Sequence, residues 1–319
     1  MFRDISIIIV SYNTVGLLRN CLVSLRNSEA AGSEIIVVDN ASGDGSAEMV
    51  QAEFPAVRLI KNGENLGFAR GSNQGIREAR GKYILMLNSD TVTHQGAVRA
   101  MTEFLESNAD AGAVTCKLLN EDGSIQATIS DRPGPVLLLF RLLSMSQLVT
   151  RDRHRRFLGS FGFVLGRTIR GYLAPYCAGI EPFEVENASG ACLMVRHAVL
   201  DSLGLLDERF FMYFEDMDLC RRIRGAGWKL YYLPQVEITH LVGKSSGNRM
   251  RRYGIHSHRA LFAFYQKHFS QTICFIVRCM VFTTSTFRWI WNCALGALLR
   301  DSGYRRNAQD LKELIRICF

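Results

Sequence analysis

The stretch ISIIIVSYN (residues 5–13) is a mostly apolar run that ends in polar side chains. A run of this kind, without alternation of apolar and polar residues, is typical of a strand in a parallel sheet that is covered on both faces. We therefore predict that residues 5–10 form a buried strand. Ser11, Tyr12 and Asn13 would then lie at its carboxyl end.

Three further apolar runs follow the first one along the chain: EIIVVD (34–39), VRLIKN (57–62) and KYILMLNSD (82–90). Each leads into a polar loop and then a helical pattern, and this alternation indicates βαβ units. The expected fold class is therefore α/β, with a Rossmann-like, mostly parallel sheet flanked by helices. Ligands of such sheets bind at the carboxyl ends of the strands. The polar residues predicted at these ends are Ser11, Tyr12, Asn13, Asp39, Asn40, Asn62, Asn88, Ser89 and Asp90.

Composition narrows the class of protein. With 319 residues, 48% of them hydrophobic, the chain can form one large α/β domain with or without a helical appendage. Its net charge of +8 favours phosphates, a nucleotide or an anionic membrane face as partners and does not single out nucleic acid. The nine cysteines include no CxxC pair, which argues against a zinc site and fits a reducing cytosol. Residues 1–10 are too short to be expected as a signal peptide.

Asp39 ends the second predicted strand and precedes a short polar loop, NASGDGS (40–46). Ser42 or Asp44 is expected to cap the helix that follows. That explanation does not cover Asp39, which lies where ligands bind. Its carboxylate could accept hydrogen bonds from a nucleobase N–H or a ribose hydroxyl.

Gly67, Gly71 and Gly75 recur at every fourth position, which places them on one face of a helix. Two explanations stay open. The glycines could allow close packing of the helix, or they could let the backbone approach a diphosphate or a sugar. No G-x-G-x-x-G fingerprint is present.

Asn88 and Asp90 are spaced i and i+2 at the end of the fourth predicted strand. Together with phosphate oxygens they could hold one hard cation such as Mg²⁺ or Mn²⁺. A capping role for Asp90 is the alternative.

The stretch FFMYFEDMDLCRRIRGAGW (210–228) places three carboxylates directly behind apolar surface. Such carboxylates are costly unless they find partners. They could open an ordinary helix, where acids suit the helix dipole, or form a reaction centre. We expect Asp218 to pair with the later arginines, and Glu215 and Asp216 to be the candidate reactive acids, desolvated by residues 210–214.

In combination these segments resemble the family-2 glycosyltransferases of the GT-A fold, most closely the rhamnosyltransferase-like members. The resemblance covers roughly residues 5–245, about three quarters of the chain. The motifs that carry it are IIIVSYN (7–13), VVDNASGDGS (37–46), NLGFARGSNQG (65–75), LNSDT (87–91), SGACLMVRHAV (189–199), LDERFFMYFEDMDLCRRIRGAGW (206–228) and THLVGKSS (239–246).

The resemblance implies roles for individual residues. Asp216 matches the family's catalytic base, with Glu215 as runner-up, and Asp90 matches the last acid of the D-x-D metal motif. Asn88 stands where the family has the first acid, so the site has one carboxylate fewer. His240 matches a metal-binding histidine of some members, although a histidine satisfied at a strand end is the alternative. The nucleotide-sugar contacts expected on this basis are Ser11, Tyr12, Asn13, Asp39 (nucleobase), Asn65, Gly67, Asn73, Asn88, Ser89 and Asp90.

The activity that the resemblance implies is inverting sugar transfer with a divalent cation, Mg²⁺ or Mn²⁺, in cell-surface polysaccharide synthesis. The best-matching donor is dTDP-rhamnose, and UDP and GDP sugars stay open. The acceptor is a saccharide or a polyprenyl-diphosphate-linked saccharide. The alternatives are a UDP- or GDP-sugar transferase of the same fold and a non-catalytic nucleotide-sugar-binding protein, which would be expected to lose acids that this chain retains.

The expected organisation is a glycosyltransferase domain at 1–250, with an acceptor-side loop or helical excursion at 133–171, and a helical region at 251–319. Within the latter, the apolar run 272–299 is interrupted by Arg278 and Arg288. It is either a buried packing helix or a helix in the membrane interface with snorkelling arginines.

The basic groups at 151–156 and at Arg249, Arg251 and Arg252 favour contact with anionic lipid. We therefore expect a cytoplasmic protein that is peripheral at the inner face of the cell membrane and has no nucleic-acid partner. Formation of a homo-oligomer stays open.

Overall fold

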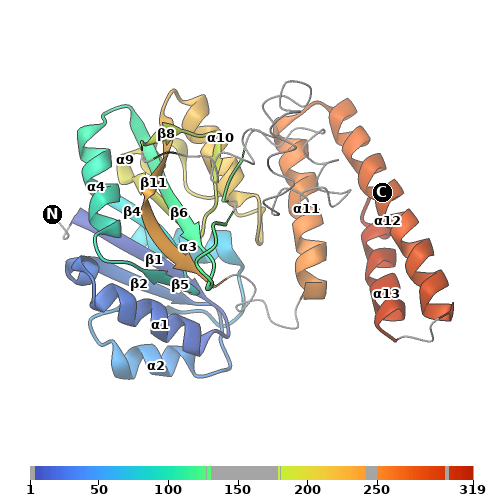
Figure 1. Cartoon of the computed structure of the whole chain (residues 1–319), viewed down its shortest axis with the longest axis horizontal. Coiled ribbons are helices and arrows are strands. Elements are labelled where there is room, and N and C mark those ends of the chain that lie inside the picture. Colours follow the sequence, from blue (N-terminus) through green and yellow to red (C-terminus); the bar gives the residue numbers. More distant parts are fainter. Residues whose placement is uncertain are drawn as a thin grey trace. The chain divides into compact units, whose positions relative to one another are not determined.

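The computed structural model describes residues 4–126, 128–130, 179, 181–241, 250–298 and 302–318. These residues form two compact units (Figure 1). The first contains the sheet and the helices that cover it, and the second contains three C-terminal helices together with the loop Met212–Phe214. The predicted excursion at 133–171, the basic cluster at 151–156 and Arg249 lie outside the described residues.

The main sheet has the strand order β3-β2-β1-β4-β10-β6-β11-β5 in the described part of the chain, with β8 beside β11. A separate ribbon pairs β7 with β9. The strands are β1 Ile5–Ser11, β2 Glu34–Asp39, β3 Arg58–Lys61, β4 Tyr83–Asn88, β5 Thr91–Thr93, β6 Ala111–Leu119, β7 Ile129–Ser130, β8 Phe183–Glu184, β9 Asn187–Ala188, β10 Cys192–Arg196 and β11 Lys229–His240.

The first half of the sheet is parallel, as the apolar runs predict. β1 pairs in parallel with β2 and with β4, and this register places Ser11 beside Asp39 and Val10 beside Asn88. The second half is mixed, because β10 runs antiparallel to both β4 and β6. The predicted α/β fold class is confirmed, and the parallel pairing is concentrated in β3-β2-β1-β4, with one further parallel pair, β6 and β11.

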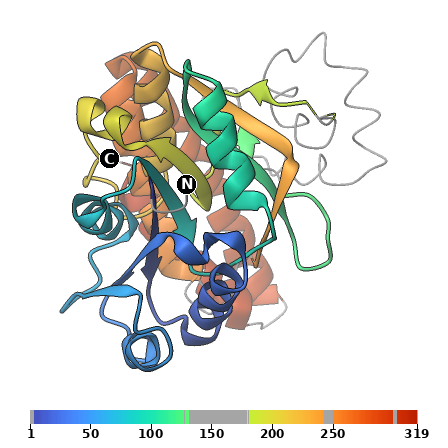
Figure 2. The same cartoon turned by 90° about the vertical axis from the view of Figure 1, so that its left-hand side faces the viewer.

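Helices cover both faces of the sheet (Figures 1 and 2). Ile5, Ile7 and Ile9 of β1 belong to one apolar core with α1, α2 and α4, whereas Ile8 belongs to a second core with α3, α9 and α10. Because both faces are buried, β1 is apolar at almost every position. The helices of this unit are α1 Val15–Arg26, η2 Glu29–Gly32, α2 Ser46–Glu53, α3 Phe68–Glu78, α4 Ala97–Ser107, α9 His197–Leu203 and α10 Glu215–Gly225.

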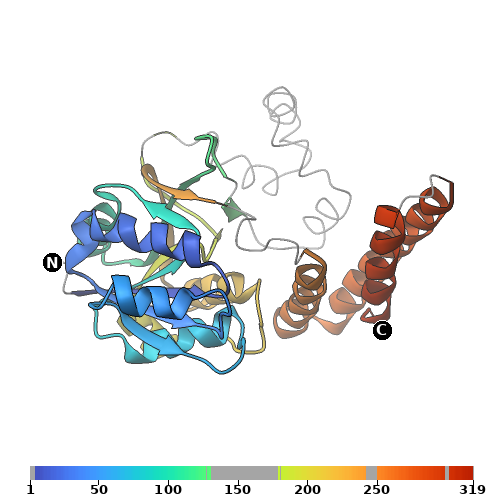
Figure 3. The same ribbon diagram turned by 90° about the horizontal axis from the view of Figure 1, so that it is seen from below.

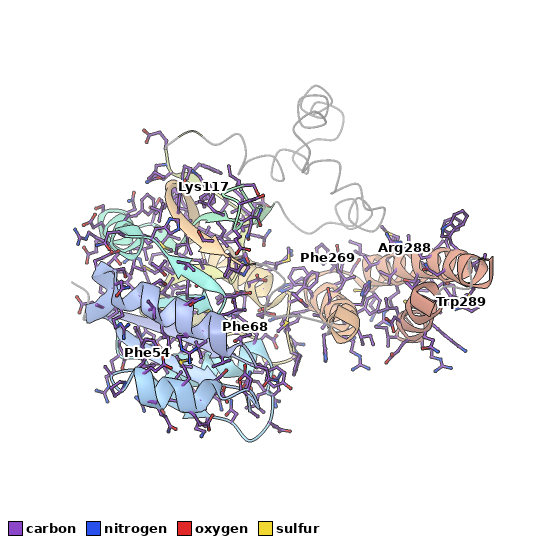
Figure 4. The ribbon with its side chains drawn as sticks, turned by 60° about the horizontal axis from the view of Figure 1, so that its bottom comes forward. Phe54, Phe68, Lys117, Phe269, Arg288 and Trp289 are labelled. Atoms are coloured by element: carbon purple, nitrogen blue, oxygen red, sulfur yellow. The ribbon has the colours of Figure 1, made fainter. Side chains whose placement is uncertain are left out.

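The segment around Pro234 forms one strand, β11, whose pairing with β6 shifts register between Leu233 and Glu237. A bulge accommodates a proline, which has no N–H to donate to the ladder. Beyond the bulge, Lys117 of β6, labelled in Figure 4, pairs with Glu237 at 2.9 Å, and the strand continues to His240.

The second unit contains α11 Met250–His268, α12 Gln271–Leu298 and α13 Ser302–Arg316. α12 and α13 lie side by side in Figures 1 and 3. Arg278, near the start of α12, donates to the carbonyl of Cys318, beyond the end of α13, at 2.7 Å. The two helices therefore form an antiparallel hairpin.

Close packing accounts for two of the three regularly spaced glycines. A Cβ added to Gly71 would lie 3.0 Å from Val10 Cγ1, and one added to Gly75 would lie 2.5 Å from Ile8 Cγ2. Both glycines lie on α3 and let it approach β1, so the packing explanation holds for them.

We predict that Gly75→Ala lowers the free energy of unfolding by about 1–3 kcal/mol, because the new methyl group displaces Ile8 in a packed core. Urea denaturation measures the effect. Gly16→Ala in α1 is the matched control, since an added Cβ there meets no atom within 4 Å. An unchanged midpoint for Gly75→Ala would contradict the packing role.

Candidate active site

The loops after β1 and β2 are joined by hydrogen bonds at the carboxyl edge of the sheet. The Asn13 amide donates to Ser42 Oγ at 2.9 Å, and the Gly43 amide donates to Asn13 Oδ1 at 2.6 Å. Asn13 has a φ of 52° and Ala41 a φ of 61°, so both adopt the left-handed conformation. The two loops therefore form one continuous wall, of which the half-buried Tyr12 is part.

Asp44 stabilises the start of two helices. Its Oδ2 accepts from the Val15 amide at 2.8 Å, and its Oδ1 accepts from the Ser46 amide at 3.1 Å. Burial acts to raise the pKa of Asp44, but the Ser46 hydroxyl and these amides outweigh it and lower the pKa. The expected capping role is confirmed for Asp44.

Asp39 is 3% exposed, and its two oxygens differ. Oδ2 accepts from the Ser42 amide at 3.0 Å, whereas Oδ1 is buried and has no hydrogen-bond partner among the described residues. An unpaired buried acceptor is unfavourable, because it has lost its water without gaining a donor. A ligand N–H or O–H at this strand end would satisfy it.

Ser11 and Ser89 are bridged by Thr14. The Ser11 and Thr14 hydroxyls lie 2.9 Å apart, and those of Thr14 and Ser89 lie 3.2 Å apart. All three residues are buried. This chain of hydroxyls ties the end of β1 to the end of β4.

A network of side-chain amides joins the loop after β2 to the loop before α3. Asn40 Nδ2 donates to the Gly67 carbonyl at 3.0 Å, and Asn62 Nδ2 donates to Asn40 Oδ1 at 2.9 Å and to Gln74 Oε1 at 2.8 Å. Asn65 Oδ1 accepts from the Gly67 amide at 2.9 Å. Asn40 and Asn62 therefore meet, as their positions at strand ends predict, and Gln74 completes the network.

Gly67 is required by a neighbouring backbone. It has a φ of 85°, and an added Cβ would lie 2.3 Å from the carbonyl oxygen of Phe211. The same carbonyl accepts from the Phe68 amide at 2.7 Å. These contacts hold the loop that precedes Glu215 against the start of α3. The structure thus explains this glycine without a sugar or a diphosphate.

Asn73, predicted as a donor contact, is held by hydrogen bonds within the protein. It is buried, its Nδ2 donates to the Leu206 carbonyl at 2.8 Å and to Glu208 Oε1 at 3.0 Å, and its Oδ1 accepts from the Leu206 amide at 3.0 Å. Its Nδ2 and Oδ1 thus fasten α3 to the segment before α10, and the donor contact stays a prediction. Asn73 therefore has a structural role.

Asn88, Asp90 and His240 meet at one point. His240 Nε2 lies 3.1 Å from Asp90 Oδ1 and 3.4 Å from Asn88 Nδ2. The Asp90 carbonyl also accepts from the Leu241 amide at 2.8 Å, which fixes the end of β11 beside the metal-motif residues.

This trio fits a divalent cation. Two adjacent ligands of an octahedral ion, each at about 2.1 Å, lie about 3 Å apart, close to the separation of His240 Nε2 and Asp90 Oδ1. The donor set of one carboxylate and one imidazole, with the Asn88 amide beside them, leaves most positions for substrate oxygens and water, as expected for Mg²⁺ or Mn²⁺.

Gln126 orients His240 from behind. Its Oε1 lies 3.0 Å from His240 Nδ1, and its Nε2 donates to the His240 carbonyl at 2.5 Å. An Nδ1–H donated to Gln126 leaves the Nε2 lone pair directed at Asp90 and Asn88. Gln126 follows a hairpin turn around Asp122 and Gly123, which is closed by the antiparallel bridge between Leu119 and Ile125.

Asp216 lies in the first turn of α10, and both of its oxygens accept amide N–H groups. The Gly190 amide donates to Oδ2 at 2.9 Å, and the Met217 amide donates to Oδ1 at 2.7 Å. The neighbouring Ala191 carbonyl accepts from the Asn88 amide at 3.0 Å. One short segment, residues 189–191, therefore joins Asp216 to the trio that contains Asp90.

Glu215 differs from Asp216 in its surroundings. It is 5% exposed, and its Oε2 has no hydrogen-bond partner among the described residues. Burial, and then the charge of Asp216, raise the pKa of Glu215 well above its ordinary value. A buried carboxyl that holds its proton is poorly suited to act as a base.

Asp218 is structural, as expected. Its fully buried carboxylate accepts from Arg222 Nε at 2.8 Å, and Arg222 also donates to the carbonyls of Leu203, Gly204 and Leu205. The pair anchors α10 to the end of α9.

The aromatic run before Glu215 is not a uniform wall, contrary to expectation. Phe210 is buried, whereas Tyr213 is exposed. Tyr213 and Phe214 have φ values of 72° and 66°, which are strained for non-glycine residues. In the second unit the Phe214 ring packs on Phe264 of α11, with centroids 5.4 Å apart, which helps to hold this strained turn.

Comparison with known proteins now decides the family. The profile described as "Glycosyl transferase family 2" matches residues 6–203, and "Glycosyltransferase like family 2" matches residues 174–272. The chain belongs to glycosyltransferase family 2. Its recognition from the motifs is confirmed, and so is the prediction that it is a glycosyltransferase.

Two relatives of this family-2 enzyme are rhamnosyltransferases. It is 26% identical over 276 residues to N-acetylglucosaminyl-diphospho-decaprenol L-rhamnosyltransferase of Mycobacterium tuberculosis, an alignment that covers 81% of this chain and 82% of the relative. It is 25% identical to rhamnosyltransferase WbbL of Escherichia coli, over 88% of this chain and 96% of the relative.

Solved structures share its GT-A fold. The mannosyltransferase PcManGT from Pyrobaculum calidifontis, in complex with GDP-Man and Mn²⁺, has a TM-score of 0.55 at 17% identity and covers 98% of this chain and 85% of its own. GalNAc-T7 with UDP, GalNAc and Mn²⁺ has a TM-score of 0.53 at 15% identity, with coverages of 82% and 49%.

Sequence reasoning missed Thr14, Gln126 and Gly190, which hold other site residues in place. Gly190 lies within the quoted motif SGACLMVRHAV, but nothing in the motif shows that its amide meets Asp216. Thr14 directly follows the strand-end residues, so its position pointed to it, whereas Gln126 directly follows a hairpin turn that the sequence alone did not connect with the site.

The environment of Glu215 predicts a pH-dependent stability. Above the ordinary pKa of 4.5, the Glu215 carboxyl loses its proton in the unfolded chain but keeps it in the folded chain. The free energy of unfolding therefore falls as the pH rises toward the pKa that Glu215 has in the folded chain. Glu215→Gln removes this loss. We expect its melting temperature to rise relative to wild type at about pH 8 and to change less at about pH 4.

Thermal melts at the two pH values check this, with the exposed Glu103→Gln as control. An equal shift for Glu215→Gln at both values would contradict it.

Proposed function

We propose that this chain is an inverting transferase that moves rhamnose from dTDP-rhamnose to a saccharide on a polyprenyl diphosphate, in cell-surface polysaccharide synthesis. The two rhamnosyltransferase relatives, aligned over more than four fifths of both chains, support the choice of sugar. The observation that carries the chemistry is that residues 189–191 join Asp216 to the trio of Asn88, Asp90 and His240.

Asp39 binds the donor base in this proposal. Its Oδ1 is the unpaired buried acceptor at the end of β2, beside Ser11 of β1. A nucleobase N–H donated to it would replace the missing hydrogen bond. The wall formed by the loops after β1 and β2 holds this carboxylate in place through the Ser42 amide.

Asp90 and His240, with Asn88 beside them, would hold the divalent cation. When bound there, Mg²⁺ or Mn²⁺ supplies charge neutralisation for the departing nucleoside diphosphate. Gln126 keeps His240 in the tautomer that leaves Nε2 free for the metal. The Mn²⁺ in both solved GT-A structures supports a divalent cation.

Asp216 is the general base. It takes the proton of the acceptor hydroxyl as that oxygen attacks the anomeric carbon and the bond to the diphosphate breaks. The Gly190 and Met217 amides fix its carboxylate, which preserves the geometry that in-line attack requires. Glu215, held protonated behind it, is a neighbour rather than the base.

We predict that Asp216→Asn lowers turnover by about 100- to 10,000-fold while donor binding survives, because the amide keeps the shape and loses the base. Single-turnover transfer and calorimetric binding of the nucleotide measure the two effects. Asp201→Asn, on the exposed face of α9, is the control. Near-normal turnover of Asp216→Asn with a large loss in Glu215→Gln would transfer the role to Glu215.

Thermal stabilisation by dTDP, UDP and GDP, with and without Mn²⁺ or Mg²⁺, tests the donor site. A ligand at 100 times its dissociation constant adds about 2.7 kcal/mol to the free energy of unfolding. We expect dTDP to act most strongly, Asp39→Asn to weaken every response, and Asp90→Asn to remove only the metal-dependent part. Asp122→Asn, in the hairpin turn, is the control.

A preference for UDP or GDP would replace the donor, and no response to any nucleotide would count against the whole proposal.

A further inference from the structure

The exposed apolar surface of this enzyme is concentrated on one helix. Apart from Tyr213, every large hydrophobic side chain that is exposed in the described part of the chain lies on α12. Phe275 is 61% and Trp291 59% exposed. The full set, named the α12 face from here on, is Phe275, Ile276, Phe282, Phe287, Ile290 and Trp291.

Helical geometry places these residues on one broad side of α12. Val277, Val281 and Ser285 recur at every fourth position and are buried, so they mark the side that packs within the unit. At 3.6 residues per turn, the members of the α12 face fall on the remaining side. α12 is therefore not the buried packing helix that was one of the two expectations for this run.

The two arginines that interrupt the apolar sequence do not lie on that face. The Arg278 guanidinium lies 4.9 Å from the centre of the Phe262 ring of α11 and donates to the Cys318 carbonyl. Arg288, labelled with its neighbour Trp289 in Figure 4, is seven positions after the buried Val281 and so falls on the same side of the helix. The α12 face is thus uncharged.

The charge of the chain is concentrated in the same region. Residues 248–319 contain twelve Lys and Arg but three Asp and Glu, whereas residues 1–247 contain 26 basic and 27 acidic side chains. The C-terminal region therefore carries the whole positive excess of the chain. An uncharged apolar helix face within a strongly basic region is the pattern of helices that bind anionic membranes.

We propose that α12 lies in the plane of an anionic membrane surface, with the α12 face inserted among the acyl chains and the basic groups of residues 248–319 at the headgroups. A second copy of the chain is a poorer occupant, because two such basic regions would repel. The assignment deepens the proposed function, since a lipid-linked acceptor would lie in the same membrane, but lipid binding itself needs no sugar transfer.

An in-plane position fits the hairpin better than a membrane-spanning one. α12 contains a segment, Gln271–Ala294, that is long and apolar enough to cross a bilayer. Yet α13 packs antiparallel along α12, and its sequence contains Arg305, Arg306, Asp310, Lys312, Glu313 and Arg316. Spanning would carry these charges toward the bilayer centre, where charged side chains are strongly unfavourable.

Flotation of the full-length protein with vesicles tests the proposal. We expect binding to vesicles of phosphatidylglycerol and phosphatidylcholine, little binding to phosphatidylcholine alone, and weakening by salt. Replacing Phe287 and Trp291 together by Ser should weaken binding at least about tenfold, since both are exposed and their loss removes inserted apolar area. The control is Thr283→Ser, exposed on the same helix.

Lipids with quenchers at different depths distinguish the two orientations. The Trp291 emission is the part of the tryptophan fluorescence that is lost in Trp291→Phe, and shallow labels should quench it most. If labels at the bilayer centre quench it most, the in-plane position is wrong. Two results would overturn the lipid assignment: no binding to anionic vesicles, or equal binding by the Ser double variant. The vesicle experiments use no sugar donor, so a lack of lipid binding would not contradict the proposed transferase activity. In the same way, a lack of sugar transfer would not contradict lipid binding by α12.

Discussion

The parallel pairing of β1 with both β2 and β4 is the constraint on which the candidate site depends. It sets Ser11 beside Asp39 and Val10 beside Asn88. The candidate nucleobase-binding residue, Asp39, and the first residue of the trio, Asn88, therefore lie on either side of β1. Every later contact builds on that edge: Thr14 bridges Ser11 to Ser89, and Asn13 ties the first loop to the second. A shift of one residue in either pairing would turn these side chains to the opposite face.

Most polar groups at this edge are already satisfied within the protein, and the exceptions are informative. Asp39 Oδ1 and Glu215 Oε2 are the buried carboxylate oxygens of the site that lack a described partner. For Glu215, retention of a proton relieves the cost of burial. For Asp39 a ligand donor is the natural solution. Sites that hold their groups in place before the substrate arrives reduce the reorganisation needed during reaction.

Local patterns in the sequence predicted the parallel half of the sheet, because continuous apolar runs report burial on both faces. They did not predict that β10 runs antiparallel or that β11 passes through Pro234, since both depend on pairing with strands distant in sequence. The meeting of Asp90 with His240 came from family resemblance. The sequence also did not show that the Asn73 amide contacts Leu206 and Glu208, and it left Gly67 undecided until Phe211 explained it.

The distribution of charge changes the meaning of the chain's net charge of +8. Taken over the whole sequence, that excess favours an anionic ligand, yet residues 1–247, which include every candidate donor and metal residue, are close to neutral. Attraction of a nucleoside diphosphate therefore cannot rest on net charge. It must come from local groups: amide donors in loops, helix starts and the cation that Asp90 and His240 can hold. The long-range positive field belongs instead to the C-terminal helices, where it acts on a surface rather than on a small molecule.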